Sequence, residues 1–304
     1  MNPREFHESR KFQTTASGKI AYLERGTGPA ALMLHGYPLN GFQWRGAIED
    51  LASERRCLAP DLMGLGYSEI PDGQDLSFVA QAKVLAAFLD GLKIDQVDLV
   101  GSDSGGGISQ VFAATYPARV RSLTLLNCEV HDTWPNEMAK LFFEQVRSRV
   151  IIQGFKLILQ DQSIAHAQLG SIYEDVAAMA TAETLKVYFE PLVANESRAE
   201  QACSFAELEN NRPQLIAVGP HLKKLTAPAQ VIWGEADTVF DMKPSLDWLR
   251  SNLGGLKRVI TVPKGKLYFG EEHPRLLSTL LLEFWRGLEA RHTTDSRASA
   301  TASA

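Results

Sequence analysis

The sequence has few cysteines and no cluster of metal-ligating residues. Its three cysteines, Cys57, Cys128 and Cys203, are scattered through the chain and show no CxxC or histidine-linked spacing. Such spacing marks most zinc and iron–sulfur sites, so we expect no metal and no other cofactor. Isolated cysteines are typical of a cytoplasmic protein that keeps its thiols reduced and buried.

The sequence also lacks long apolar runs and an excess of positive charge. No run approaches the ~20 apolar residues that span a bilayer. The polar segment at residues 1–12 has no apolar centre, so we expect no signal peptide. The formal net charge of −5 gives no reason to expect nucleic acid or an anionic membrane as a partner. We therefore expect a cytoplasmic monomer or homodimer whose partner is a small apolar molecule.

The sequence does contain an alternation of short apolar runs with helical segments. Apolar runs occur at residues 30–34, 97–100, 120–126, 230–233 and 259–262. Continuous apolar runs of this length are typical of strands buried on both faces of a parallel sheet. We predict an α/β protein with a mostly parallel central sheet flanked by helices, and a ligand site at the carboxyl ends of the strands.

The alternation stops over residues 133–218, where we find only helical patterns. This predicts a core domain of residues 1–132 and 219–292 with an inserted helical cap of residues 133–218. A final helix is expected from about Pro274 to Leu288, because proline favours the first turn of a helix. The tail at residues 293–304 is rich in Ser, Thr and Ala, and we predict that it is disordered.

The stretch Val100–Gly107 is predicted to form a sharp turn between a buried strand and a helix. Its glycines allow neighbouring elements to approach closely, and Asp103 lies at the centre of the turn. Such a turn holds one strained residue at the end of a sheet. A carboxylate needs no deprotonation at neutral pH, so Asp103 is a candidate nucleophile. The alternative is that Asp103 only caps the helix.

Four motifs in this order resemble those of α/β-hydrolases, over about residues 12–290. The motifs are His35-Gly36-Tyr37-Pro38, the DLMGLGYS segment of residues 61–68, the Asp103 turn and the WGEAD segment of residues 233–237. Aspartate at the turn resembles the branch of haloalkane dehalogenases and epoxide hydrolases. The resemblance implies an α/β-hydrolase fold in which Asp103 attacks carbon and forms an ester that water hydrolyses.

The resemblance also implies roles for residues around Asp103. The backbone N–H groups of Tyr37 and Ser104 match the family's oxyanion hole, which stabilises developing negative charge. Asp237 matches the acid that orients an imidazolium. Glu129 stands where some dehalogenases have this acid, so two candidate acids stay open.

The position of the general base departs from the family pattern. The family has a histidine in the loop before the last helix. Counting back from Pro274 places Leu267 at that position, and a slip of one residue places Lys266 there. Leucine cannot accept a proton, and lysine would have to be strongly desolvated to do so near pH 7. The departure of the whole loop favours natural divergence over an engineered replacement.

His131 is the candidate for a relocated base. It follows the strand after the Asp103 turn, so we expect it near the top of the sheet, within reach of Glu129 or Asp132. The alternative is a structural histidine that binds the first loop of the cap together with Trp134.

The candidate substrate-binding residues are His35, Trp134, Tyr173 and Tyr188. The resemblance to epoxide hydrolases implies that Tyr173 and Tyr188 match the two cap tyrosines that polarise the epoxide oxygen in those enzymes. The alternative is that these tyrosines only pack against neighbouring helices. Ser104 stands where dehalogenases usually have a halide-binding tryptophan, so epoxide-like or ester-like substrates are preferred over haloalkanes. We therefore predict a hydrolase of small or medium apolar substrates. The alternatives are a cofactor-free lyase or isomerase, and an inactive ligand-binding homologue.

Overall fold

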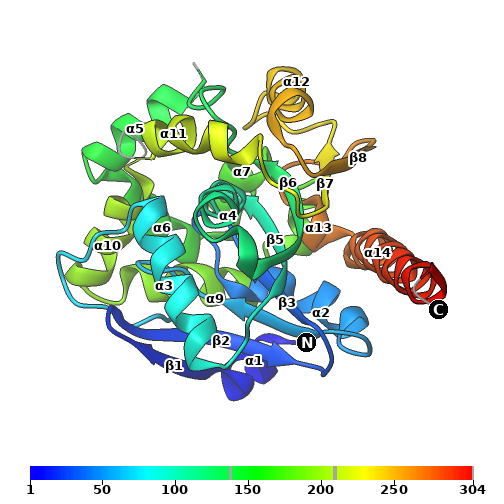
Figure 1. Cartoon of the computed structure of the whole chain (residues 1–304). Helices are drawn as coiled ribbons and strands as arrows, with labels where there is room; N and C mark the ends of the chain where they lie inside the picture. Colours follow the sequence, from blue (N-terminus) through cyan, green and yellow to red (C-terminus); the bar gives the residue numbers. More distant parts are fainter. Residues whose placement is uncertain (137–138, 208–210, 303–304) are drawn as a thin grey trace.

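A computed structural model describes residues 1–136, 139–207 and 211–302, with side chains up to Arg291. Eight strands form one sheet in the order β1-β2-β4-β3-β5-β6-β7-β8 (Figure 1). The strands are β1 (Lys11–Thr15), β2 (Gly18–Arg25), β3 (Ala30–Leu34), β4 (Arg56–Pro60), β5 (Val97–Asp103), β6 (Val120–Cys128), β7 (Ala229–Gly234) and β8 (Leu256–Val262). The ladders from β4 along the sheet to β8 are parallel, whereas the β1–β2 and β2–β4 ladders are antiparallel. The predicted α/β class and mostly parallel sheet are confirmed.

The central strands are buried because helices pack on both faces of the sheet. Every residue of β3 and β5 is buried, which explains their continuous apolar runs. One group of helices packs together from α3 (Phe78–Gly91) through α4 (Ser104–Thr115) and α11 (Arg212–Leu222) to α12 (Met242–Asn252). A second group joins α2 (Arg45–Leu51), α13 (Phe269–Glu272) and α14 (Pro274–Ala302). The carboxyl ends of the parallel strands share one edge of the sheet, where a ligand site is expected.

Of the seven helices between β6 and β7 in the described part of the chain, the first six pack mainly on one another. They are α5 (Ala139–Arg147), α6 (Val150–Gln160), α7 (Gln162–Leu169), α8 (Val176–Met179), α9 (Ala182–Val193) and α10 (Glu196–Ala206). The cap predicted over residues 133–218 also includes most of α11, which instead packs along α4 through buried side chains such as Leu215 and Leu222. The structure therefore returns to the core layer at α11.

Both ends of the chain are helical. A short helix, α1 (Pro3–Ser9), precedes β1, and its Phe6 is buried. At the other end, α14 continues to Ala302, past the predicted end near Leu288, so this backbone is helical where the sequence predicted a disordered tail. Alanine and arginine in this segment favour helix. None of the helices in the described ranges is long and apolar enough to cross a membrane. The three cysteines are buried free thiols.

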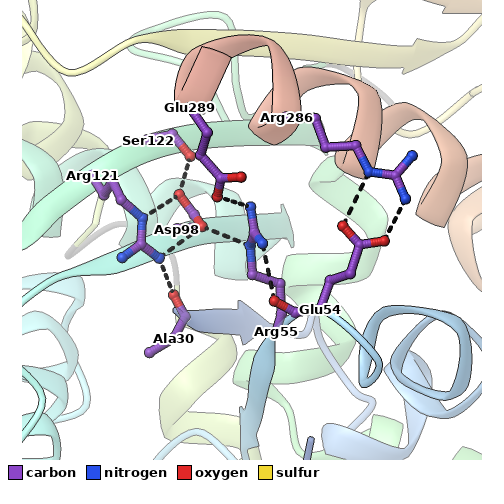
Figure 2. Close-up of polar contacts among 8 residues, drawn as sticks. All are labelled: Ala30, Glu54, Arg55, Asp98, Arg121, Ser122, Arg286 and Glu289. Atoms are coloured by element: carbon purple, nitrogen blue, oxygen red, sulfur yellow. Dashed lines mark hydrogen bonds and ion pairs between the residues drawn. The ribbon is translucent and has the colours of Figure 1, made fainter. Parts of the chain in front are cut away.

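A buried ion cluster fixes the amino-terminal end of β5, opposite the Asp103 turn (Figure 2). Asp98 is 2% exposed and accepts hydrogen bonds from Arg121 Nη2 at 2.7 Å, Ser122 Oγ at 2.7 Å and Arg55 Nε at 3.3 Å. Arg55 also donates to Glu289 of α14 at 2.7 Å. Burying these charges is tolerated because each is paired and hydrogen-bonded. The cluster joins β5, β6 and α14 beneath the site.

Candidate functional site

Asp103 sits in a strained turn at the carboxyl end of β5. Its φ is +56° and it caps the amino end of α4, a conformation that few non-glycine residues adopt. Glycine at position 36 lets the loop after β3 pass against it. A Cβ on Gly36 would lie 2.3 Å from the Cβ of Asp103. The close fit leaves Asp103 only 7% exposed.

Three donors converge on Oδ1 of Asp103. The backbone N–H of Tyr37 donates to it at 3.2 Å, and the Ser104 hydroxyl donates to it at 2.8 Å. The backbone N–H of Ser104 also points at this oxygen. Two backbone N–H groups aimed at one oxygen form a fixed binding site for negative charge. The structure therefore brings Tyr37, Ser104 and Asp103 together.

Tyr268, in the loop after β8, reaches the other carboxyl oxygen of Asp103. Its hydroxyl lies 3.2 Å from Asp103 Oδ2 and 2.6 Å from the carbonyl oxygen of Tyr37. The single hydroxyl hydrogen points mainly at the closer carbonyl, which can only accept. Oδ2 is therefore held more weakly than Oδ1.

The expected base positions do not contact the nucleophile. Lys266 Nζ donates to the carbonyl oxygens of Gly170 and Tyr173 at 2.6 and 2.9 Å, and Leu267 lines the cavity with apolar atoms. The side chain of this loop that reaches Asp103 is Tyr268. Counting back from Pro274 does not find Tyr268, because residue spacing alone does not fix the register of the loop between β8 and the last helix.

Glu129 lies just after β6 and is connected to Asp103 through Ser104. Its carboxyl group is 2% exposed, and its Oε1 lies 3.1 Å from the Ser104 hydroxyl. Its Oε2 has no hydrogen-bond partner among the described residues. Burial, together with the negative charge of Asp103, raises the pKa of Glu129 well above its usual range. Burial also raises the pKa of Asp103, against the hydrogen bonds from Ser104, Tyr37 and Tyr268.

Asp237, the other expected acid, lies in the loop after β7. Its Oδ2 accepts a hydrogen bond from Asn127 Nδ2 at 2.7 Å and its Oδ1 accepts one from the N–H of Val239 at 2.8 Å. Burial raises the pKa of Asp237 to about 6. The carboxylate is thus occupied by an amide and a backbone group, and it is not part of the cavity wall.

His131 points away from Asp103, which corrects the expectation that it could be a relocated base. Its backbone has φ +48°, and this turn directs the ring onto α12. There it stacks on Trp248 with ring centres 4.6 Å apart, and its Nδ1 lies 2.8 Å from Asp132 Oδ1. The ring is not among the groups that line the cavity.

His35 holds the backbone rather than substrate. Its Nε2 accepts a hydrogen bond from the N–H of Leu62 at 2.9 Å, so its Nδ1 carries the hydrogen that faces the Gly36 carbonyl at 3.0 Å. Complete burial lowers the pKa of His35 to about 4. The neutral ring therefore joins the loops that follow β3 and β4, and it does not reach the cavity.

The two tyrosines expected to bind substrate instead bind a buried carboxylate. Tyr173 and Tyr188 donate to Glu271 of α13 at 2.8 and 2.6 Å, and Arg45 forms an ion pair with the same carboxylate. A buried charge needs such partners, so both hydroxyls are engaged here. Neither tyrosine lines the cavity. Their role is to attach the inserted helices to the core.

A cavity of about 680 Å³ opens above Asp103. Its polar floor is formed by Asp103, Ser104 and Glu129. Its walls are mainly apolar and include Trp134, Phe142, Phe155, Phe189, Phe205, Phe240 and Leu267. The indole N–H of Trp134 has no partner in the described part of the chain. None of the residues that line the cavity is a histidine, and no group of potential metal ligands occurs in the described ranges. The cavity suits a small apolar molecule with one polar end.

Known proteins are similar to this chain in sequence and in fold. Residues 29–274 match the family described as "alpha/beta hydrolase fold". Haloalkane dehalogenase 2 of Mycobacterium tuberculosis is 28% identical over 286 residues, which cover 91% of this chain and 94% of that protein. The cis-3-alkyl-4-alkyloxetan-2-one decarboxylase of Shewanella oneidensis is 26% identical over 253 residues, or 79% of this chain and 77% of that one.

Solved structures agree with the sequence comparison. An ancestral haloalkane dehalogenase superposes with a TM-score of 0.75 at 26% identity, covering 92% of this chain and 99% of that one. The match to the family extends over most of the chain and includes the Asp103 turn. The protein therefore belongs to the family with the alpha/beta hydrolase fold.

Proposed function

We propose that the protein is a hydrolase of small or medium apolar electrophiles with Asp103 as nucleophile. One observation carries the proposal: two backbone N–H groups hold Oδ1 of Asp103 while Oδ2 is weakly held. The firmly held oxygen sits where negative charge can be stabilised, and the other is free to attack.

The reaction has two steps. Oδ2 of Asp103 forms a bond to an electrophilic carbon of the substrate as the bond to the leaving group breaks, which gives an ester from an epoxide or haloalkane and an acid anhydride from an activated ester. Water then attacks Cγ of Asp103, and the charge that develops on Oδ1 is stabilised by the N–H groups of Tyr37 and Ser104. The bond between Cγ and Oδ2 breaks, and the product leaves with the Oδ2 oxygen.

The cavity supports apolar substrates. Its phenylalanine walls bind the apolar part, and the inserted helices α5 to α10 act as a cap over the strand ends. Trp134 lines the cavity, and its indole N–H, which is buried without a partner in the described part of the chain, is the donor that we propose for a substrate oxygen or leaving group. Ser104 offers a smaller donor than an indole directly after the nucleophile, so we favour epoxides and activated esters over haloalkanes.

The first experiment is a substrate panel of styrene oxide, p-nitrophenyl butyrate and 1-bromohexane. We expect hydrolysis of styrene oxide or the ester, and no turnover by Asp103→Asn, which keeps the size of the side chain but removes its charge. Circular dichroism checks that the variant is folded. Equal turnover by the variant would contradict the proposal.

A cofactor-free lyase is a second candidate, because one relative is named as a decarboxylase of four-membered cyclic esters and none of the described residues that line the cavity is a histidine. A lyase needs no base to activate water. A cis-3,4-dialkyl oxetan-2-one separates the two: a lyase releases CO₂ and an alkene, whereas a hydrolase releases the hydroxy acid.

A further inference from the structure

The Ser104 hydroxyl lies between two buried carboxyl groups. Its oxygen is 2.8 Å from Asp103 Oδ1 and 3.1 Å from Glu129 Oε1. A hydroxyl carries one hydrogen and can donate it to one of these oxygens only. The second contact is favourable only when the other carboxyl group is protonated and donates to Ser104. The two carboxyl groups therefore hold one proton between them in addition to the serine hydrogen.

The surroundings place that proton on Glu129. Asp103 receives hydrogen bonds from the backbone of Tyr37 and Ser104 and from Tyr268, which favour its charged form. Oε2 of Glu129 receives none from the described residues. Asp103 is therefore the carboxylate, and Glu129 is the neutral acid that donates to Ser104.

We propose that Glu129 is both the proton donor and the base of the reaction, coupled to Asp103 through the Ser104 hydroxyl. This inference rests on the proposed function of Asp103 as nucleophile. Ester formation removes the negative charge of Asp103, and with it the charge that keeps the proton on Glu129. Glu129 then ionises and can accept a proton from water.

The protons balance over both steps with an epoxide. In the first step, Oδ2 of Asp103 bonds to carbon, the epoxide C–O bond breaks, and the Glu129 proton passes to the new alkoxide. In the second step, water adds to Cγ and gives one proton to Glu129. The Cγ–Oδ2 bond breaks and the departing alcohol takes the second water proton. Asp103 ends as a carboxylate and Glu129 as an acid, so the resting state is restored.

The position of Glu129 suits this role. Glu129 forms part of the cavity floor beside Asp103, and its Oε2 is buried without a hydrogen-bond partner among the described residues. Its backbone is fixed by Gln110 of α4, whose Nε2 donates to the Glu129 carbonyl at 2.7 Å. His131, the histidine expected as a relocated base, stacks on Trp248 instead, and His35 binds the backbone N–H of Leu62.

The test is Glu129→Gln, which keeps the shape of the side chain but cannot carry a proton between steps. With 1-bromohexane the leaving group needs no proton, so we expect one hexyl group per protein to accumulate on Asp103, measured by mass spectrometry. Its hydrolysis should be slower by about 10²–10⁴-fold, the usual contribution of a general base. With styrene oxide, the formation of the ester should be slowed as well, because the proton donor is also lost.

Two further variants separate catalysis from structure. In Glu129→Ala, added formate should restore hydrolysis of the hexyl ester, because the small carboxylate fits the space left by the side chain. Glu183→Gln, on the exposed face of α9, makes the same chemical change away from the cavity and should behave as wild type.

The outcomes distinguish this inference from the proposed function. If Glu129→Gln hydrolyses the hexyl ester as fast as wild type, Glu129 is not the base, although Asp103 remains the nucleophile. If the wild type turns over a probe but Asp103 becomes modified neither in the wild type nor in Glu129→Gln, the proposed function is wrong and the inference fails with it.

Discussion

Replacing Tyr268 with phenylalanine removes one buried hydroxyl from beside the nucleophile. The hydroxyl donates mainly to the Tyr37 carbonyl at 2.6 Å and more weakly to Asp103 Oδ2 at 3.2 Å. Because a donor to a carboxylate lowers its pKa, its loss raises the pKa of Asp103. A full hydrogen bond to a charged group contributes ~1.5–3 kcal/mol, and we take ~1 kcal/mol for this shared contact, equivalent to ~0.7 pKa unit.

The assay is the pH dependence of kcat/KM for the best substrate of the panel. The fall of kcat/KM at low pH reports protonation of Asp103. In Tyr268→Phe the midpoint of this acidic limb should move to higher pH by about 0.7 unit, and kcat/KM at pH values below the limb should be about fivefold lower than in the wild type. Unfolding by urea should also show a loss of about 1–3 kcal/mol, because the buried Tyr37 carbonyl loses its donor.

The matched control is Tyr22→Phe. Tyr22 is a buried tyrosine of β2 that packs edge-on against Phe88 and does not line the cavity. Its loss should leave the acidic limb unchanged. A limb that stays in place in Tyr268→Phe, or moves to lower pH, would refute the reasoning about Asp103.

Three other substitutions test separate parts of the account. Trp134→Phe removes the unpaired indole N–H from the cavity and should raise KM for styrene oxide about two- to tenfold, as for one lost hydrogen bond; an unchanged KM would exclude this donor. His131→Ala should keep wild-type turnover, because the ring stacks on Trp248 away from the cavity. Loss of turnover would show that His131 takes part in the reaction. Asp98→Asn removes the charge that pairs with the buried Arg55 and the partly buried Arg121, of which Arg55 keeps Glu289, and should reduce the free energy of unfolding by about 3–5 kcal/mol in urea, with unchanged activity of the folded protein.

The sequence predicts the sheet because burial on both faces requires continuous apolar runs. The runs at residues 30–34 and 97–100 match β3 and β5. The Asp103 turn is predictable for a related reason. The turn needs small residues where backbones meet, and a Cβ at Gly105 would lie 2.3 Å from the carbonyl oxygen of Leu34. These steric requirements act on the residues of the turn itself, so they can be recognised in the sequence.

The directions of side chains beyond the strand ends depend on residues that are far away in the sequence. His131 follows β6 as expected, but a left-handed backbone turns its ring to α12. Tyr173 and Tyr188 are drawn to Glu271, which is distant in sequence, and no spacing rule connects them. Tyr268 was missed because loop register cannot be counted reliably between β8 and α14. These contacts depend on how the inserted helices pack on the core.

The most direct test of the account is oxygen exchange into Asp103. The protein turns over styrene oxide in H₂¹⁸O, and the peptide that contains Asp103 is then analysed by mass spectrometry. The account predicts that ¹⁸O enters the Asp103 carboxylate, while the diol from a single turnover carries the unlabelled oxygen of Asp103. Label in the diol of that first turnover, with none in Asp103, would show that water attacks the substrate directly and would contradict the account.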